Sequence, residues 1–459
     1  MTHPSSNGDG ARTPRPADLN APDFSSYGEA WRVCIDFGTA ASKASLCRVG
    51  FGGAPSSATV RPLALSDDGG LAPSALLFHD GRVRFGAAAL EASEDAAVTS
   101  EPLLSFKTFL SARDYDVALA MNLPRSIDES AAFRQRDALV LYSAYLLALT
   151  DRALAGVANA PNAASGCPRR YTHPLWKAPV VDAAFMQRVL NEADAVRGAL
   201  GEAMFGLDGV SMADASAALT DAVKRPGAAR IEAGVFEAQA AAACHVYSGR
   251  DAPEHVMVFD MGAGTTDIAA FAPGAVEIDA ARRTSHLACD ELDKIIVAMF
   301  MDRADQKAPR ALRKKLWRNL RRRARRLKQD IFAGQTAEAQ FEGKVLRVSL
   351  KDVQSDGLFK AFHKDLNAVF QASLDALAKR AAADGRDRIG IVLAGGGSAL
   401  PFVHDMALRA KPRERKVRRV DVAPVVPDWA RDASFQGALA PVFPQMAIAI
   451  GGAAAPLTI

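Results

Sequence analysis

Cysteine is scarce in this chain, which has five in 459 residues. No two of them are spaced as C-x-x-C, so the sequence offers neither a zinc-ligand pair nor a disulfide framework. The eight histidines form no H-x-x-x-H pair, which argues against a dedicated transition-metal site. We therefore expect reduced thiols in a cytosolic protein. The cysteines are Cys34, Cys47, Cys167, Cys244 and Cys289.

Signals for membranes and secretion are also missing. We find no apolar run long enough to span a bilayer, and the N-terminus lacks the apolar core of a secretory signal. Residues 1–29 are rich in Pro, Ser, Gly and Asp and are predicted to form a disordered tail. The net charge of +4 is too small to argue for or against nucleic acid. The composition, 49% hydrophobic and 24% charged, is typical of a soluble globular protein with two to three domain-sized units.

One stretch that is present, residues 256–270 (VMVFDMGAGTTDIAA), predicts a strand, a tight turn and a second strand. Glycine lets a ligand approach the main chain, and successive N–H groups in such a turn form a concavity suited to phosphate. Threonine hydroxyls add donors, and the flanking aspartates can hold the water shell of Mg²⁺. A plain hairpin would explain the glycines but not two aspartates that bracket them. The candidate residues are Asp260, Gly262, Gly264, Thr265, Thr266 and Asp267.

A related stretch lies near the start of the predicted fold. Residues 33–46 (VCIDFGTAASKASL) have the same layout, with Asp36 before a turn that contains Gly38 and Thr39. One such hairpin in each half of the chain suggests two similar lobes that hold one nucleotide from opposite sides. Both hairpins resemble the phosphate loops of the actin-like ATPase fold. That resemblance implies two α/β lobes with mixed sheets around a nucleotide cleft.

The block between the hairpins narrows the resemblance. A Pro-Ser strand at 71–78 and an alanine-rich helix at 87–98 precede residues 102–110 (PLLSFKTFL), where Lys107 is the only cation among apolar neighbours. This order resembles the first lobe of the Hsp70 chaperone ATPase domain. Sugar kinases and cell-division actin homologues share the hairpins but usually not this block. The resemblance implies that Lys107 reaches the γ-phosphate and the attacking water, although such a lysine usually lies at the surface.

Further segments resemble the same family but differ from it at individual residues. Residues 235–243 (VFEAQAAAA) resemble a family segment whose glutamate lies near Mg²⁺, so Glu237 is a candidate, and a helix-starting carboxylate is the alternative. The family's proline is Ala238 here, which puts the relay to a peptide-binding domain in doubt. Residues 285–293 resemble another family motif, but its two glycines are Ala288 and Cys289. The segment 201–229 looks like an insertion.

Residues 307–328 are strongly basic, with apolar residues at three- or four-residue spacing. The spacing favours an amphipathic helix with a solvated basic face over a nucleic-acid site or a site for an acidic partner. The family places an adenosine-contacting helix here. Lys328 matches its lysine, whereas Arg325 and Phe332 replace its glutamate and serine.

Residues 389–401 (IGIVLAGGGSALP) predict a buried strand, a glycine-rich turn and a helix start. They resemble the family's adenosine motif, which implies that Gly395, Gly396 and Gly397 line the adenosine pocket. The resemblance covers residues 31 to about 455, the ATPase domain alone, and we expect no peptide-binding domain. We predict a tail at 1–29, lobe I at 30–245 and lobe II at 246–459, with a basic helical subdomain around 292–385 and a C-terminal helix.

These observations predict an Hsp70-like protein that binds and slowly hydrolyses ATP with Mg²⁺, acts through lobe closure on a protein partner, and resides in the cytoplasm. Asp36 and Asp260 would hold Mg²⁺ through water, and Lys107 would neutralise the γ-phosphate. Asp260, Asp267 or Glu237 could accept the proton. An actin-like filament or scaffold protein and a small-molecule kinase of the same fold are the alternatives, and the departures leave a pseudo-ATPase open.

Overall fold

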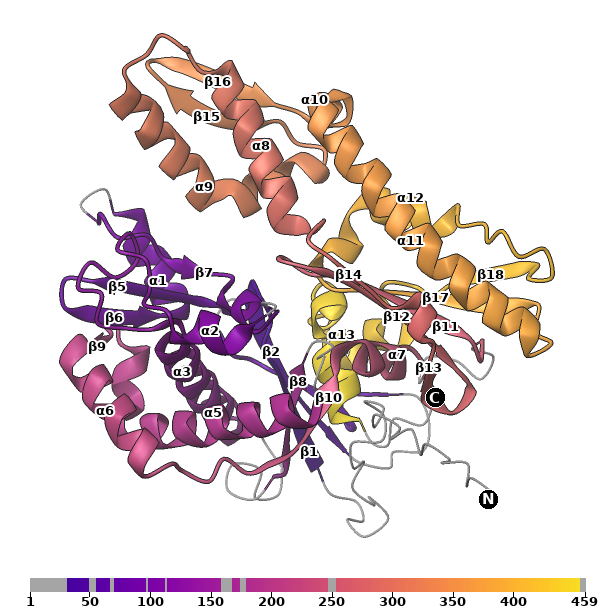
Figure 1. Ribbon diagram of the computed structural model, residues 1–459, viewed down its shortest axis with the longest axis horizontal. Helices are drawn as coiled ribbons and strands as arrows, with labels where there is room; N and C mark the ends of the chain where they lie inside the picture. Colours follow the sequence, from indigo (N-terminus) through magenta and orange to yellow (C-terminus); the bar gives the residue numbers. More distant parts are fainter. Residues whose placement is uncertain are drawn as a thin grey trace, which may run out of the picture.

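The computed structural model describes residues 31–48, 55–66, 70–95, 98–111, 114–157, 167–173, 179–246 and 253–454. The predicted tail at 1–29 lies outside the described residues. Figure 1 shows two bodies of mixed helix and sheet, one from the indigo and magenta half of the chain and one from the orange half, with the yellow helix α13 between them.

Two large sheets repeat one topology. In the first, β1 pairs antiparallel with β2 and parallel with β8, and the strand order is β10-β8-β1-β2-β3. In the second, β11 pairs antiparallel with β12 and parallel with β17, and the order is β13-β12-β11-β17-β18. The repeat places the two predicted hairpins at equivalent positions. The strands are β1 (Trp31–Asp36), β2 (Ala41–Arg48), β3 (Val60–Leu63), β8 (Arg169–His173), β10 (Ile231–Phe236), β11 (Val256–Met261), β12 (Thr266–Ala272), β13 (Val276–Glu277), β17 (Arg388–Ala394) and β18 (Arg419–Val422).

The central strands are buried along almost their whole length because both faces of each sheet are covered. Every residue of β11 is buried, and so are all but the first residue of β1 and of β17. Short strands complete the sheets: β4 (Ala72–Pro73) pairs with β2, and β14 (Arg283–Ser285) pairs with β12.

A small four-stranded sheet accompanies the first body. Its order is β7-β5-β6-β9, and the predicted insertion at 201–229 supplies β9 and helix α6. Helix α1 is shorter than predicted and ends at Glu94. These elements are β5 (Ala75–His79), β6 (Arg82–Phe85), α1 (Gly86–Glu94), β7 (Leu103–Leu104), the 3-10 helix η3 (Phe106–Ser111), α2 (Tyr115–Ala120), η4 (Gly201–Phe205), β9 (Val210–Ser211) and α6 (Met212–Lys224).

Helices α3 (Gln135–Ala155) and α5 (Pro179–Leu200) pack together in this body. Although apolar residues recur at helical spacing from residue 131, α3 begins only at Gln135. The Asp128 carboxylate accepts hydrogen bonds from the Ala132 and Phe133 N–H groups and holds them in a loop. We also expected no apolar run long enough to span a bilayer, and this was wrong. Helix α3 is long and apolar enough to do so by length and composition alone. It is a core helix, with 72% of its apolar window buried.

The second body contains the strongly basic helix and its neighbours. Helix α8 packs on α9, and the hairpin of β15 and β16 contacts both helices. This group lies at the top of Figure 1, and the long helix α11 leads from it back to the second sheet. The elements are α8 (Cys289–Arg303), α9 (Arg310–Phe332), β15 (Ala337–Phe341), β16 (Lys344–Val348), α10 (Leu350–Ser355), α11 (Gly357–Ala383), η7 (Gly396–Ala399) and α12 (Pro401–Leu408), with 3-10 turns η5 (Pro273–Ala275), η6 (Asp279–Ala281), η8 (Asp428–Arg431) and η9 (Ala433–Phe435).

Two helices join the sheets. Helix α7 (Glu237–Val246) follows β10 and packs on β11, and α13 (Phe443–Ala453) packs on α7, β1, β2 and β17. Their contact needs a small residue, because a Cβ at Gly451 would lie 1.8 Å from the Ala240 carbonyl oxygen. The predicted lobe boundary near residue 245 falls at the end of α7 and stays a prediction.

Candidate functional site

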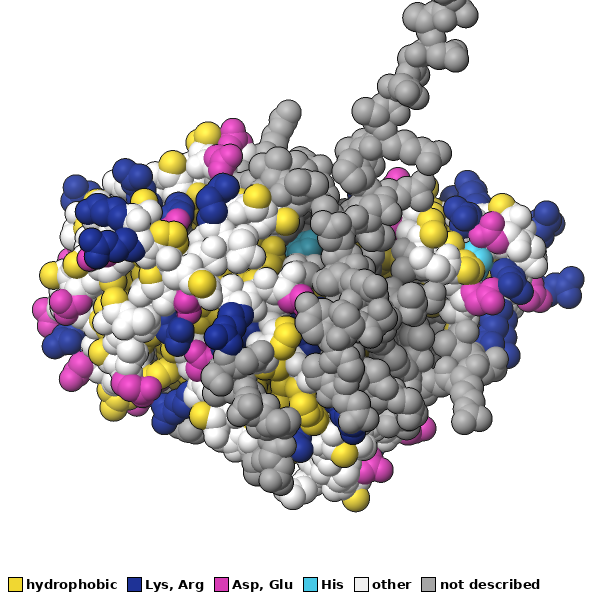
Figure 2. All heavy atoms as spheres, turned by 90° about the horizontal axis from the view of Figure 1, so that it is seen from below, with side chains coloured by type: hydrophobic (Ala, Val, Ile, Leu, Met, Phe, Trp, Pro, Cys, Tyr) yellow, Lys and Arg dark blue, Asp and Glu magenta, His cyan; other side chains and the backbone are white. Residues whose placement is uncertain are grey.

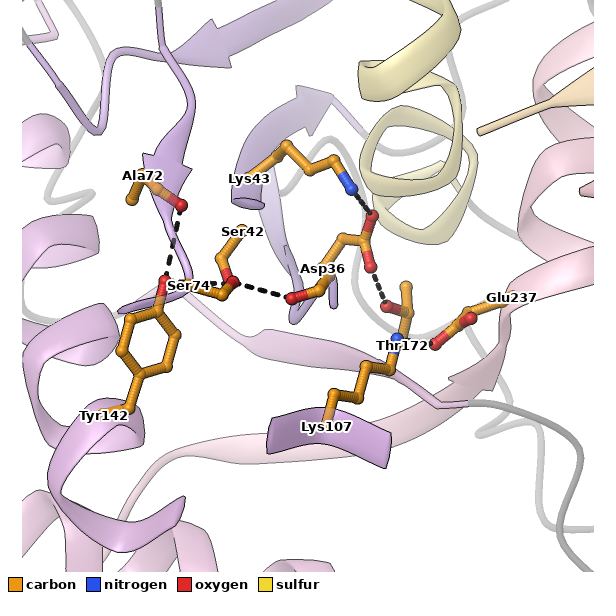
Figure 3. Close-up of polar contacts among 10 residues, drawn as sticks. Asp36, Ser42, Lys43, Ala72, Ser74, Lys107, Tyr142, Thr172 and Glu237 are labelled. Atoms are coloured by element: carbon orange, nitrogen blue, oxygen red, sulfur yellow. Dashed lines mark hydrogen bonds and ion pairs between the residues drawn. The ribbon is translucent and has the colours of Figure 1, made fainter. Parts of the chain in front are cut away.

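The first hairpin places a buried carboxylate at its turn. Asp36 is the last residue of β1, and its Oδ2 accepts a hydrogen bond from Lys43 Nζ at 2.7 Å, while Oδ1 accepts one from Thr172 Oγ1 at 2.7 Å (Figure 3). Burial by itself would raise the pKa of Asp36. The positive charges of Lys43 and Lys107 and the two hydrogen bonds outweigh burial and hold that pKa below its usual value. Asp36 is therefore an anion paired to a cation.

The turn after Asp36 is tightly packed. A Cβ at Gly38 would lie 2.1 Å from the Ala41 carbonyl oxygen, so only glycine fits. The Gly38 carbonyl accepts a hydrogen bond from Ser74 Oγ at 2.7 Å, and a hydroxyl network of Ser74, Ser42 and Tyr142 supports the turn from behind. Figure 3 shows this network running from the Tyr142 ring to the turn. Thr39 lies half-buried in the turn.

A cation from η3 and a carboxylate from α7 meet beside this hairpin. Lys107 Nζ donates to Glu237 Oε1 at 2.5 Å, although 130 residues separate the two, and both side chains are buried. Burial lowers the pKa of Lys107, but the charges of Glu237 and Asp36 more than compensate and raise it, so the ammonium stays charged. Burial raises the pKa of Glu237, and the charges of Asp36 and Asp267 add to that rise against the pull of Lys107.

The second hairpin supplies an unsatisfied carboxylate. Asp260 lies on β11 opposite Asp267 on β12, it is 7% exposed, and its Oδ1 atom is buried without a hydrogen-bond partner. Burial is the largest cause that raises the pKa of Asp260 to about 8, followed by the negative charges of Glu237, Asp267 and Asp36. The aspartates of the two hairpins therefore act on one another's charge, and their role in holding Mg²⁺ stays a prediction.

The second turn is held by its own hydroxyls. Asp267 accepts from Thr265 Oγ1 at 2.8 Å and from Thr284 Oγ1 at 2.7 Å, and the Gly262 N–H donates to the Thr265 carbonyl. Thr266 Oγ1 donates to the Leu287 carbonyl at 2.8 Å, so its hydroxyl proton is engaged by the backbone. The carbonyls of the turn accept N–H groups from the first turn of α8, which positions that helix against the hairpin. Gly264 lies half-buried at the turn.

The glycine-rich turn after β17 packs against Asp260. Gly395 has a φ of +75°, and a Cβ there would lie 2.3 Å from Asp260 Oδ1. A Cβ at Gly397 would lie 2.4 Å from the Met261 side chain, whereas Gly396 has more room. The main chain of this turn therefore packs directly against the second hairpin, and its role in an adenosine pocket stays a prediction.

The Lys328 side chain contacts two residues of the neighbouring helix α8. Its Nζ lies 2.8 Å from Asp293 Oδ1 and 3.0 Å from the Cys289 carbonyl oxygen, so it ties α9 to α8. Phe332, which replaces the family's serine, packs on Phe402 and Phe359. These rings line a groove of about 570 Å³ between α9, α11 and α12, and the lining includes none of the predicted site residues.

Two groups that contact Asp36 were not predicted from the sequence. Lys43 lies seven residues after Asp36 and faces it across the hairpin, and Thr172 comes from β8. The contact of Lys43 could have been recognised from the sequence. Lys43 follows Asp36 by seven residues, Asp267 follows Asp260 by the same number, and each pair is directly opposite in its hairpin. The contact of Thr172 depends on a parallel pairing over 130 residues of chain, which no local pattern indicates.

The predicted Mg²⁺ ion can be tested against these donors. Among the described residues, no three His, Cys, Asp or Glu side chains converge closely enough to ligate a metal directly. Coordination through water fits better, because the orphaned Asp260 oxygen needs a donor and lies in an acidic cluster. Asp36 already accepts hydrogen bonds from Lys43 and Thr172, one on each oxygen, so it would contact the water shell of Mg²⁺ with its remaining lone pairs.

Comparison with known proteins covers part of this chain. The family model described as Hsp70 protein matches residues 217–428, a segment that includes Glu237, the second hairpin, α9 and the glycine-rich turn. No curated protein matches the chain.

Proposed function

Because this chain is an Hsp70-like protein with the two-lobed actin-like ATPase fold, we propose that it binds ATP with Mg²⁺ and hydrolyses it to ADP and phosphate. One observation supports the proposal: four buried charged groups from four separate elements act on one another's charge beside the two hairpins, and two of them, Lys107 and Glu237, are in direct contact. The four groups are Asp36, Lys107, Glu237 and Asp260. Such a cluster is costly to bury unless charged ligands complete it.

The phosphates would lie against the main chain of the two turns. Gly38 and Thr39 in one hairpin, with Gly262, Gly264 and Thr265 in the other, would offer N–H and hydroxyl donors. Thr266 supports the turn through Leu287. Gly395, Gly396 and Gly397 would form the adenosine wall, and Lys328 would set the position of α9 beside it. When bound, Mg²⁺ would supply charge neutralisation at the phosphates, held through water by Asp260 and, beside Lys43, by Asp36.

The remaining chemistry is positioning and proton transfer. Lys107 would move from Glu237 toward the γ-phosphate, neutralise its charge and orient the attacking water. Glu237, and Asp260 with its unpartnered oxygen, are better proton acceptors than Asp267, whose two oxygens already accept threonine hydroxyls. A carboxylate whose pKa lies near the working pH is well suited to this role, and the pKa of Asp260 is raised to about 8.

We further propose that lobe closure is the output, sensed by a protein partner, and that the protein works in the cytoplasm. Cross-lobe contacts support closure as the signal: Ser105 Oγ donates to Asp290 Oδ2 at 2.9 Å, and Arg325 reaches toward the Ala40 carbonyl at 3.5 Å. Five buried free thiols are consistent with a reducing compartment.

The test is calorimetry with ATP and ADP in Mg²⁺, followed by an assay of phosphate release without an acceptor. We expect one nucleotide per chain and phosphate release to water. Formation of ADP and a phosphorylated acceptor, without release of free phosphate, when a hydroxyl compound is added would support a small-molecule kinase. Nucleotide-dependent sedimentation would support a filament. Absence of any nucleotide binding would contradict the proposal.

A further inference from the structure

Helix α9 concentrates the positive charge of this protein. Between Arg310 and Phe332 it has eleven Lys and Arg residues and a single acidic one, Asp330, which gives a net charge of +10. Because the whole chain carries +4, all the other residues together carry −6. The face of the molecule in Figure 2 shows the ordinary arrangement instead, with Lys and Arg side chains interspersed with Asp and Glu.

One side of α9 is packed and the opposite side is open. Leu316, Leu320, Ala324, Leu327 and Ile331 are buried in the core of the subdomain. Arg325 faces Asp290 of α8, and Lys328 pairs with Asp293 of the same helix. The acidic groups beside α9 therefore neutralise these two cations. Six other cations are exposed, and we call them the basic face: Arg310, Lys314, Lys315, Arg321, Arg323 and Arg326.

The positive charges of the basic face are not neutralised by nearby acidic side chains among the described residues. Within the part of the chain that the structure describes, none of its six side chains has a carboxylate within ion-pair distance. Arg310 and Lys314 are four residues apart, so their like charges repel along the helix. A helix face that only contacts solvent is equally soluble with Lys, Arg, Asp and Glu mixed, and mixing the signs removes this repulsion. The one-signed arrangement is therefore explained by an anionic partner.

We propose that the basic face binds the phosphate backbone of a nucleic acid. Eight of the eleven cations in α9 are arginines, whose planar guanidinium matches phosphate oxygens in pairs. Arg321 lies over the Trp317 ring, with its guanidinium carbon 4.9 Å from the ring centroid, which adds a flat surface for base stacking. The helix has 23 residues and so extends about 34 Å, long enough to follow several phosphates. This inference does not depend on ATP binding.

The test uses the full chain and fluorescence anisotropy with labelled oligonucleotides of roughly 20 nucleotides, single-stranded RNA, duplex RNA and duplex DNA, because the helix covers only part of such a length. A polyglutamate peptide of similar charge is the competing probe. The variant carries Lys314→Gln, Lys315→Gln, Arg321→Gln and Arg326→Gln, all at exposed positions. A matched control removes four cations elsewhere, with Lys411→Gln, Arg413→Gln, Arg415→Gln and Lys416→Gln.

We expect the wild-type chain to bind oligonucleotides more tightly than polyglutamate, with affinity that falls steeply as salt rises. The variant should weaken binding by at least about 10-fold and reduce the salt slope by up to about four, one for each phosphate that the variant no longer neutralises. The control should change affinity by less than about 3-fold. Equal weakening in variant and control, tighter binding of polyglutamate, or no oligonucleotide binding would each overturn the proposal. Unchanged thermal unfolding of both variants verifies that they are folded.

Discussion

Lys43 Nζ lies 2.7 Å from Asp36 Oδ2, across the turn of the first hairpin. In the second hairpin the equivalent register pairs Asp260 with Asp267, two carboxylates. One hairpin therefore pairs its aspartate with a cation, and the other places its aspartate opposite a second carboxyl group. Burial raises the pKa of Asp260 to about 8, and the charges of Glu237 and then Asp267 add to the rise. Asp36 is also buried, but the charge of Lys43 helps to hold its pKa below the usual value.

The first prediction concerns that ion pair. Lys43→Met removes the principal cation of a buried carboxylate, so it should destabilise the protein by about 3–5 kcal/mol in urea denaturation. The double variant Lys43→Met with Asp36→Asn removes both charges and should recover much of the stability, because Thr172 can still donate to the amide oxygen. A double variant no more stable than Lys43→Met alone would show that the pair is not coupled.

The second prediction concerns the pH dependence of stability. The pKa of Asp260 is raised above its value in the unfolded chain, so its contribution to stability is fully present below pH about 4 and is lost as the pH rises through about 8. Relative to Asp260→Asn, which does not titrate, the wild-type protein should therefore lose stability across this window. The difference changes by at most about 1.4 kcal/mol per pH unit.

Urea denaturation of both proteins at several pH values measures this difference, because the titration of groups that do not interact with Asp260 cancels in the comparison. Parallel stability profiles for wild type and Asp260→Asn would show that Asp260 ionises normally.

The third prediction separates binding from turnover. Lys107→Ala removes the cation proposed to reach the γ-phosphate, so phosphate release should fall by about 10²–10³-fold. ATP affinity in calorimetry should fall by less than about 10-fold, because the turns hold most of the phosphate oxygens. Lys294→Ala is the control, since that lysine is 73% exposed and lies outside the site. Phosphate release at the wild-type rate in Lys107→Ala would refute the role assigned to Lys107.

The fourth prediction isolates the close approach of Gly395 to Asp260. Gly395→Ala introduces two penalties, a strained positive φ and a Cβ 2.3 Å from Asp260 Oδ1. Gly385→Ala introduces the strain alone, because its φ is +73° and no atom lies within 4 Å of the added Cβ. The control should lose roughly 1 kcal/mol of unfolding free energy, and Gly395→Ala should lose more and should also bind ATP weakly. Equal destabilisation in the two variants would show that the close approach is unimportant.

Local patterns predicted the parts of the site that are continuous in sequence. Both hairpins and the glycine turn after β17 are short apolar runs with glycines at their ends, and the structure confirms them as strands and turns. The fold class followed from the repetition of the hairpins. The same reasoning located Asp36, Asp260 and Gly395, because the turn that each one flanks is visible in the sequence.

Interactions between distant segments could not be predicted this way. The bond between Lys107 and Glu237 depends on how η3 and α7 pack, and a lysine among apolar residues is as consistent with the surface as with a buried pair. Thr266 was assigned to phosphate from its place in the turn, but its hydroxyl proton goes to Leu287, a residue 21 positions later. The raised pKa of Asp260 is likewise a property of the assembled cluster.

The central claim is that two hairpins from opposite lobes hold one triphosphate together. Calorimetric titration of ATP into wild type, Thr39→Val, Thr265→Val and the double variant tests it most directly. We predict one site per chain, weaker binding for each single variant, and a reduction in the double variant that differs from the sum of the two single reductions in binding free energy. Wild-type affinity in either single variant, or no ATP binding by the wild-type chain, would contradict the claim.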